Sequence, residues 1–357
     1  MKFLNVLRGP LVLAVAALIT ACSTAPGVPK NSGSAALESV PPMVATPKPP
    51  PKIGLALGGG AARGFAHVGV IQALEARGYH IAGIAGSSMG SLVGGIYAAG
   101  RLNEYSEWAR GLERGDVLRL LDFAFGYPGL IRGERVIGAL RELVGEHLIE
   151  ELPIPYVAVA TDLVRQREVW LTRGKLFDAI RASIAIPMVF TPHVFDGREL
   201  VDGGLLSPVP IAATRAMRAD RVIAVDVNGP VSWANPGLEP RHEEMAAGHG
   251  SEDDAGSPDD DGPATLRERM AAIWEGLAKS GNGNAKPEKS RGVMDLMSRS
   301  LDTMQAHMSR VQLAQDPPDL LIQISRETAT FYEFWRAAEL VEKGREAAEK
   351  ALDTAGL

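Results

Sequence analysis

Residues 53–64 read IGLALGGGAARG, and residues 81–90 read IAGIAGSSMG. In each stretch a short apolar run stops at small residues, which is typical of a buried strand that ends in a tight loop. Helical patterns follow over residues 65–77 and 89–99, and each is closed by a glycine. Further apolar runs lie at residues 156–160, 222–227 and 319–324. This alternation predicts an α/β fold around a mostly parallel sheet.

The composition excludes several classes of protein. The chain has 357 residues, of which 46% are hydrophobic and 22% are charged. This balance is typical of a globular protein and not of a disordered, collagen-like or polytopic membrane chain. The formal charge of −6 argues against a nucleic-acid partner. The single cysteine excludes an intramolecular disulfide and a cysteine-rich zinc site.

The N-terminus has the three parts of a bacterial secretory signal. Lys2 and Arg8 precede an apolar run over residues 11–19, and small residues then lead to Cys22. The run is shorter than the roughly 20 residues that a membrane-spanning helix needs. The ending resembles a lipoprotein signal, which implies cleavage before Cys22 and lipid attachment to it. Ser23 then favours the outer membrane of the bacterial cell envelope, and an ordinary cleaved signal is the alternative.

The chain divides into segments of different composition. We predict a signal peptide at 1–21, a lipid-anchored Pro- and Ser-rich tether at 22–52, an α/β domain with the motifs described below at 53–211, a continuation of its core at 212–235, an acidic, disordered insertion at 236–292, and a C-terminal helical region with one possible strand at 293–357.

The insertion is strongly acidic. Residues 236–263 contain nine acidic residues and one arginine, which gives a net charge of −8. Six residues have the spacing of a calcium-binding EF-hand loop, namely Ser257, Asp259, Asp261, Gly262, Thr265 and Glu268. Because the first of these positions lacks the usual aspartate, we predict no metal site and keep calcium as the weaker alternative.

A glycine loop, Gly58-Gly59-Gly60, joins the first strand to the first helix. Backbone N–H groups at a helix N-terminus attract anions, so a negative group is expected there. A nucleotide phosphate is the weaker candidate. The loop lacks the Lys-Ser/Thr pair of a Walker motif, and Arg63 stands where a dinucleotide fingerprint has its third glycine.

The segment Gly86-Ser87-Ser88-Met89-Gly90 matches the G-x-S-x-G nucleophile elbow, between a predicted strand and a predicted helix. Successive parallel strands are usually neighbours, about 4.8 Å apart, so the glycine loop and Ser88 should lie side by side. We therefore predict Ser88 as a nucleophile whose oxyanion meets the N–H groups of Gly59 and Gly60. A plain tight turn is the alternative.

A serine nucleophile needs a base, and an aspartate fits better than a histidine. His193 is the only histidine predicted in a loop outside the insertion. The others lie in predicted helices, at helix ends or in the insertion, namely His67, His307, His80, His147, His242 and His249. Asp202 follows an apolar run and precedes Gly203-Gly204, so the backbone can approach closely and leave its carboxylate facing the site. Asp162 and Asp226 are expected to tie loops.

Three of these stretches resemble the signatures of the bacterial patatin-like phospholipases: Gly58 to Gly64, Gly86 to Gly90, and Asp202-Gly203-Gly204. Ala160 to Leu163, Arg181 to Pro187, and Pro208 to Pro210 extend the likeness, which covers about residues 53–211. The resemblance implies a three-layer α/β/α fold with a mostly parallel sheet. It also implies a Ser–Asp dyad that hydrolyses lipid acyl esters and requires no histidine.

The resemblance assigns roles to individual residues. The nucleophile is Ser88, the base is Asp202, and the oxyanion hole is formed by Gly58, Gly59 and Gly60. Residues in supporting positions are Arg63, Gly64, Gly86, Gly90, Gly203 and Gly204. Two positions depart from the family pattern, because Ala61 and Ser207 replace a frequent glycine and a common asparagine. For Arg63 we favour a structural role in the loop.

The expected reaction is hydrolysis of a membrane phospholipid or lysophospholipid through an acyl-enzyme, with no cofactor. Asp202 should be partly desolvated, because a carboxylate of ordinary pKa is a weak base. The alternatives are an acyltransferase or thioesterase with the same dyad, and a membrane-tethered scaffold without activity. The sequence identifies no protein partner.

Overall fold

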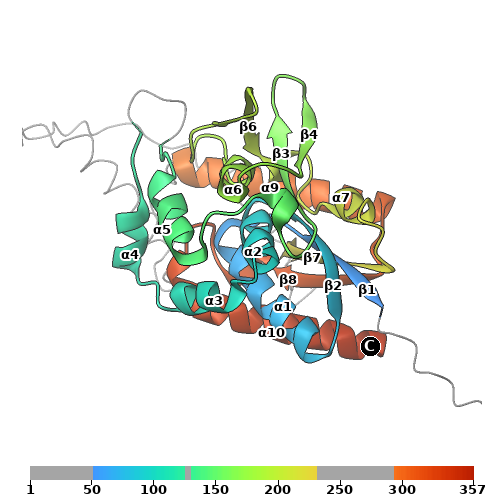
Figure 1. Cartoon of the computed structure of the whole chain (residues 1–357). Helices are drawn as coiled ribbons and strands as arrows, with labels where there is room; N and C mark the ends of the chain where they lie inside the picture. The colour runs from blue at the N-terminus through green and yellow to red at the C-terminus, as the bar shows by residue number, and fades with distance from the viewer. Residues whose placement is uncertain (1–50, 125–129, 231–292) are drawn as a thin grey trace, which may run out of the picture. The chain divides into compact units, whose positions relative to one another are not determined.

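The computed structural model describes residues 51–124, 130–230 and 293–357, and these residues form one sheet flanked by helices (Figure 1). Within them the strand order is β5-β6-β3-β2-β1-β7-β8, and β4 pairs with β3 alone. The strands are β1 (Lys52–Leu57), β2 (His80–Ser87), β3 (Tyr156–Asp162), β4 (Arg167–Leu171), β5 (His193–Phe195), β6 (Arg198–Asp202), β7 (Arg221–Gly229) and β8 (Leu320–Ser325).

The sheet is mostly parallel, as the sequence predicts. Strands β3, β2, β1, β7 and β8 run parallel to one another, whereas β4 and β6 pair antiparallel to β3, and β5 pairs antiparallel to β6. Leu57 at the end of β1 lies opposite Gly86 near the end of β2. The glycine loop and the nucleophile elbow therefore leave the sheet at the same edge.

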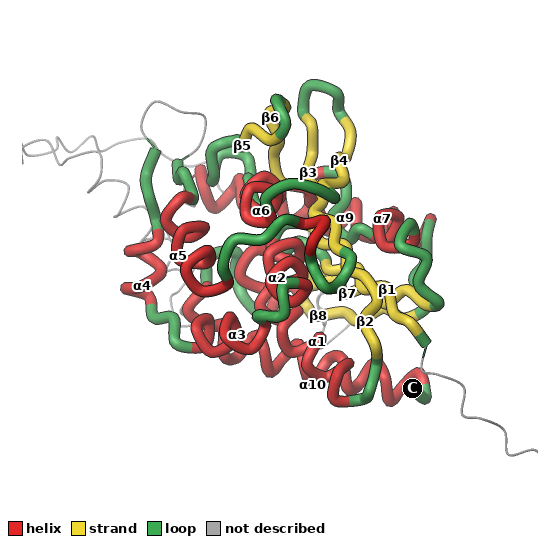
Figure 2. The backbone as a smooth tube through the Cα atoms, viewed as in Figure 1, coloured by secondary structure: helices red, strands yellow, loops and turns green. Residues whose placement is uncertain are grey.

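Helices cover both faces of the sheet and complete three layers (Figure 2). The helices are α1 (Ala66–Ala76), α2 (Met89–Ala98), α3 (Leu102–Arg110), α4 (Arg114–Leu120), α5 (Glu134–Val144), α6 (Leu176–Ser183), α7 (Ile211–Arg215), α9 (Val293–Gln315) and α10 (Ala337–Ala355). The larger hydrophobic core contains residues of α1, α2, α3, α5, α6 and α10, and α7 packs on the other face. The described fold is therefore the predicted α/β/α architecture.

The side chains of β1 explain why the two faces differ. Ile53, Leu55 and Leu57 belong to the larger core, and Ala56 belongs to a smaller one on the opposite face. Gly54 shares the smaller face, where a methyl group would lie 2.9 Å from Thr214 Cγ2 of α7. Small residues on this side of the strand let α7 approach the sheet closely.

The predicted segments differ from the structure in a few places. His80 is the first residue of β2, not a helix end, because the chain turns at Gly78 and enters the sheet directly. Strands β4, β5 and β6 were not predicted, since β4 and β5 are partly exposed and show no apolar run, and the run before Asp202 in β6 is only two residues long. The signal, the tether up to residue 50 and the EF-hand-like residues lie outside the described residues. Lys52, predicted as the end of the tether, is the first residue of β1.

Two further findings concern the residues that the structure describes. Residues 49–357 form one compact unit, and both its sheet and its cores are built from residues after position 51. None of the helices described in this unit is long and apolar enough to cross a membrane.

Candidate active site

Ser88 occupies a strained turn between β2 and α2. Its φ of 52° lies in the left-handed region, which costs a non-glycine residue on the order of 1–3 kcal/mol. A methyl group at Gly90 would lie 2.1 Å from the carbonyl oxygen of Leu57, so only glycine permits this close turn. The Ser88 N–H donates to Ser183 Oγ at 3.0 Å, and that hydroxyl donates to the Val159 carbonyl at 2.6 Å. These contacts hold the elbow in place.

Asp202 accepts a hydrogen bond from the hydroxyl group of Ser88. Ser88 Oγ donates to Asp202 Oδ2 at 2.6 Å, and the Gly204 N–H donates to Oδ1 at 2.7 Å. The Asp202 side chain is 1% exposed, and burial raises its pKa to about 7, although both hydrogen bonds favour the ionised form. The expected desolvation of this carboxylate is therefore present. It gives Asp202 the basicity that a proton acceptor needs near neutral pH.

Asp202 approaches Ser88 from an antiparallel strand. An acidic residue of an α/β site is expected at the carboxyl end of a parallel strand, but β6 is antiparallel to β3, with Asp202 opposite Ala160. Strand β3 continues beyond the end of β2, and β6 pairs with this extension. The rule was wrong for this residue, although the two side chains meet as predicted.

The carbonyl groups of the glycine loop are held by buried side chains. His67 Nε2 lies 2.7 Å from the Gly58 oxygen, and Asn228 Nδ2 donates to the Gly59 oxygen at 2.7 Å. Burial lowers the pKa of His67 to about 4, so this imidazole is neutral and donates through Nε2. Together these residues fix the loop from the helix side and from the end of β7.

Arg63 connects this loop to the C-terminal region, which supports the structural role expected for it. Its guanidinium donates to Asn228 Oδ1 at 2.7 Å and to Asp302 Oδ1 of α9 at 2.9 Å. A third bond goes to the carbonyl oxygen of Ala329 at 3.2 Å. The side chain is 2% exposed, so its charge is neutralised inside the protein and does not face a ligand in solution.

The predicted oxyanion hole needs a correction, because two N–H groups of the glycine loop already donate hydrogen bonds to backbone carbonyls. Gly58 N–H donates to the Val225 carbonyl and Gly59 N–H to the Pro208 carbonyl, both at 2.9 Å. They are therefore not free to bind an oxyanion. None of the backbone hydrogen bonds described outside regular strands and helices uses the N–H of Gly60 or Ala61.

The loop still lies directly beside the nucleophile, as predicted. A methyl group on Gly59 would be 3.2 Å from Ser88 Cβ. Ala61 has a φ of 46°, which explains why glycine is favoured at this position in the resembling family. The remaining glycines allow close packing: a methyl group at Gly64 would contact Met89, at Gly86 the α2 backbone, at Gly203 the Val159 carbonyl, and at Gly204 Gln305.

The other predicted candidates lie apart from this pair. Asp162 binds the backbone and side chain of Arg165, which lowers its pKa, and Asp226 accepts the N–H of Asn228. Both therefore tie loops, as expected. His193 begins β5 opposite Leu200, and the hydroxyl hydrogen bond of Ser88 goes to Asp202 instead. Within the described residues no cluster of three or more potential metal ligands occurs.

An apolar cavity of about 110 Å³ opens beside Ser88. Apart from Ser88, its lining is aliphatic or aromatic and comes from α2, α3, α4, α5 and the segments around residues 184–190 and 331–334. Arg181 fixes part of this wall, because its guanidinium binds the carbonyl oxygens of Arg132 and Thr191. A cavity of this kind suits an alkyl chain next to Ser88.

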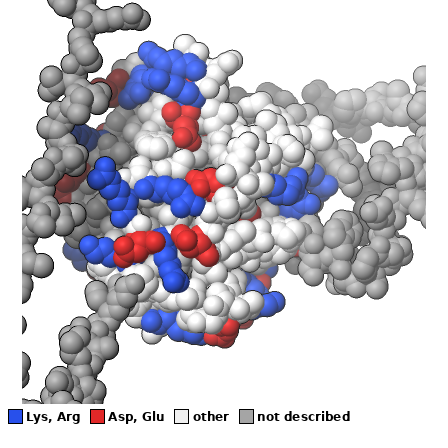
Figure 3. All heavy atoms as spheres, turned by 90° about the vertical axis from the view of Figure 1, so that its right-hand side faces the viewer, with Lys and Arg blue, Asp and Glu red and all other residues white. Residues whose placement is uncertain are grey.

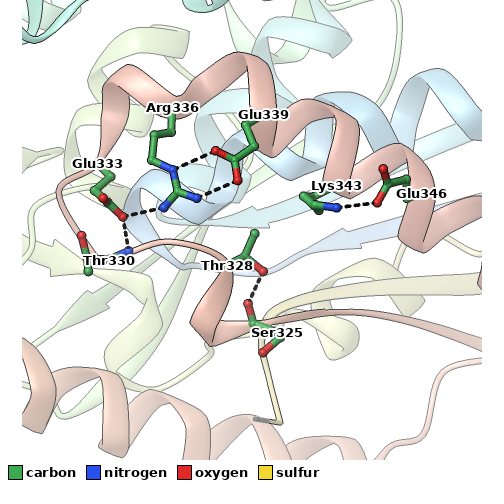
Figure 4. Close-up of polar contacts among 8 residues, drawn as sticks. All are labelled: Ser325, Thr328, Thr330, Glu333, Arg336, Glu339, Lys343 and Glu346. Atoms are coloured by element: carbon green, nitrogen blue, oxygen red, sulfur yellow. Dashed lines mark hydrogen bonds and ion pairs between the residues drawn. The ribbon is translucent and has the colours of Figure 1, made fainter. Parts of the chain in front are cut away.

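Two cavity residues, Phe331 and Phe334, come from a C-terminal segment that the sequence analysis left without a role. Polar contacts fix this segment (Figure 4). Glu333 accepts the Thr330 N–H and an Arg336 guanidinium N–H, both at 2.8 Å. Phe334 then packs edge-on against Phe65, with ring centroids 6.1 Å apart.

Sequence reasoning missed three supporting residues, Ser183, Asn228 and Asp302. Ser183 lies within the stretch Arg181 to Pro187, so the resemblance already pointed to its neighbourhood. Asn228 directly follows the predicted strand at residues 222–227, which was an available signal. Asp302 lies on α9 and carries no local signal, because its partner Arg63 is distant in sequence.

The chain is similar to several known proteins. A family model described as patatin-like phospholipase matches residues 55–215. An uncharacterized NTE family protein of Mycobacterium bovis is 42% identical over 330 residues, which cover 85% of this chain and 92% of that protein.

Two longer relatives match only a part of their length. A lysophospholipase of Mycosarcoma maydis is 38% identical over 180 residues, which cover 49% of this chain and 10% of that protein. Patatin-like phospholipase domain-containing protein 6 of Homo sapiens is 34% identical over 183 residues, 49% of this chain and 13% of that protein. The crystal structure of VipD from Legionella pneumophila aligns with 86% of this chain and 67% of its own, at a TM-score of 0.40 and 14% identity.

Proposed function

This chain belongs to the patatin-like phospholipase family, and from that premise we propose that it is a serine lipid acyl hydrolase of the phospholipase A or lysophospholipase type. The observation that carries the proposal is the 2.6 Å hydrogen bond from Ser88 Oγ to a buried Asp202, beside an apolar cavity. The family membership supports action on lipids. The Ser–Asp chemistry and the substrate are our inference.

The proposed reaction starts with the transfer of the Ser88 hydroxyl proton to Asp202. Ser88 Oγ then attacks the ester carbonyl, and the alcohol part of the lipid leaves with a proton returned by Asp202. Water next attacks the acyl-enzyme and gives a proton to Asp202, which passes it to the leaving Ser88 Oγ as the fatty acid is released. A nucleophile activated in this way divides one difficult step into two easier ones.

We propose that the oxyanion is bound by the N–H groups of Gly60 and Ala61. Their neighbours Gly58 and Gly59 already donate to Val225 and Pro208, and this fixes the direction of the loop. A donor that is held in place before the reaction needs no reorganisation, and one such donor typically contributes about 3–4 kcal/mol to the transition state. The buried anchors His67 and Asn228 support this fixed geometry.

The experiment that tests this function measures fatty acid released from vesicles of phospholipid and of lysophospholipid. Residues 49–357 would be used, since they form a compact unit of their own. We expect release by the wild-type segment and none above background for Ser88→Ala. Release that does not depend on Ser88 would refute the proposal, and transfer of the acyl group to an added alcohol would instead favour an acyltransferase.

We further propose that the protein is a lipoprotein held in the bacterial cell envelope, at the outer membrane, through lipid on Cys22. The sequence pattern around Cys22 supports this, and the anchor would keep the enzyme close to its substrate. Mass spectrometry of the protein from cell membranes should find acyl chains on Cys22. In fractionated cells Cys22→Ala should leave the membrane fraction, and unchanged membrane association of this variant would contradict the assignment.

A further inference from the structure

Helix α9 turns a polar face toward the edge of the sheet at which the active site lies. Asp302 binds Arg63 behind the glycine loop, and Gln312 Nε2 donates to the carbonyl oxygen of Leu206 at 2.8 Å. Gln305 lies between these two anchors on the same side of the helix and is 8% exposed. It belongs to a part of the chain that the family model does not match.

The amide of Gln305 lies next to the carboxylate of Asp202. A methyl group on Gly204 would lie 2.7 Å from Gln305 Nε2 and 2.9 Å from Asp202 Oδ1, so both atoms lie against the same side of this glycine. Asp202 Oδ2 faces Ser88, whereas Oδ1 accepts the Gly204 N–H and can accept a second hydrogen bond. With the described residues the Gln305 side chain makes no hydrogen bond, so both of its N–H donors are available beside Oδ1.

The ionisation of Asp202 is set by its immediate neighbours. Burial raises its pKa, and the hydrogen bonds from Ser88 and Gly204 lower it. The charged and titratable side chains on the elements packed around it face other groups or solvent, namely Asp162, Arg181, His193, Arg198, Glu199 and Asp302. On the face of the molecule in Figure 3, positive and negative side chains are intermixed, so that surface imposes no potential of one sign. A donor beside Oδ1 therefore acts on this carboxylate directly.

We propose that Gln305 is a positioning residue for the base, and that its amide donates a hydrogen bond to Oδ1 of the ionised Asp202. This bond, together with the Gly204 N–H, holds the carboxylate so that Oδ2 points at Ser88. It also favours the ionised form, which is the form that accepts the serine proton. The inference rests on the proposed function in that Asp202 acts as the base, and it names the residue of α9 that supports this base.

The first test measures the ionisation of Asp202 without any substrate. In residues 49–357 with carbon-13-labelled aspartate, the carboxyl carbon of Asp202 is identified by its loss in Asp202→Asn, and its NMR signal is followed with pH. Gln305→Met keeps nearly the same length but has no donor, so it should raise the pKa of Asp202 by about one pH unit. Gln305→Lys places a cation beside Oδ1 and should lower this pKa by about as much.

The matched control is Gln312→Met. It removes an amide from the same face of α9, about two turns away, where the amide binds Leu206 and not the carboxylate. The control should leave the pKa of Asp202 unchanged, whereas a residue that only stabilises the helix would give equal results at both positions. An unchanged pKa in both Gln305 variants, or an equal change in Gln312→Met, would overturn the proposal.

Ester hydrolysis gives a second readout. In Gln305→Met the rising limb of kcat/KM should move about one pH unit upward with the same plateau, so the rate at pH 6 should fall about tenfold. In Gln305→Lys the limb should move to lower pH. A limb that does not move in either variant would refute the role of Gln305. A wild type that releases no fatty acid would refute the proposed function instead, and the NMR titration would still decide the role of Gln305.

Discussion

Ser88→Ala is expected to lower the rate of ester hydrolysis about a millionfold, because no other group can form the acyl-enzyme. Asp202→Asn should lower the rate about 10³- to 10⁴-fold, since the amide keeps the shape of the site but cannot accept the serine proton. Steady-state hydrolysis of a soluble ester measures both rates. The fall should be in kcat. Asp202 does not line the apolar cavity, and Ser88→Ala removes only one hydroxyl group from it, so substrate binding should change little.

The pH dependence identifies the base. Asp202 acts when it is ionised, and burial raises its pKa to about 7. Therefore kcat/KM should rise about tenfold per pH unit below pH 7 and level off above it. His193→Ala should keep this profile. A profile that is flat from acid to neutral pH, or a His193→Ala variant without activity, would show that Asp202 is not the base.

The central part of the site could be predicted because its signals are local. The loop Gly58–Gly60 and the elbow around Ser88 each lie within one strand–turn–helix unit, and their spacing alone restricts the backbone. Neighbouring parallel strands then bring the two units together, as the structure has them. Asp202 was predicted from the two glycines that follow it. The antiparallel direction of its strand was not predicted.

Which N–H groups of the glycine loop are already hydrogen-bonded could not be predicted, because the carbonyl groups that accept these bonds are distant in sequence. Whether Gly58 and Gly59 offer free N–H groups depends on the carbonyls of Val225 and Pro208, and nothing near the loop indicates those contacts. The short strand β6 was missed for the same reason, because it is stabilised by pairing with β3, which is distant in sequence. Strand β5 is three residues long and pairs with β6 in a hairpin.

The cavity was also beyond the sequence analysis. Residues such as Trp108 and Phe334 read as ordinary apolar positions of helices, and only packing turns them toward Ser88. Phe331 and Phe334 lie outside residues 55–215, the part that the family model matches. The apolar cavity beside Ser88 is therefore built in part by a C-terminal region that the family model does not match.

Asp202→Asn is expected to stabilise the protein while it removes activity. The pKa of Asp202 rises from 3.8 to about 7 on folding, so the folded state keeps a proton that the unfolded state has released between these pH values. Stability is therefore lost as the pH rises through this window, by up to about 4 kcal/mol at pH 8. Asparagine stays neutral at every pH and avoids this cost.

Urea unfolding of both proteins from pH 4 to pH 8 measures the difference. At pH 8 the variant should be more stable by a few kcal/mol, and near pH 4 the two curves should meet. Asp162→Asn is the matched control with the opposite sign, because hydrogen bonds from Arg165 lower the pKa of Asp162 and that carboxylate stabilises the fold when ionised. Equal stability of wild type and Asp202→Asn at pH 8 would show that Asp202 is not held in an unfavourable charged state. A gain at pH 8 joined to loss of hydrolysis would show that the site keeps a buried carboxylate for its basicity and at the expense of stability.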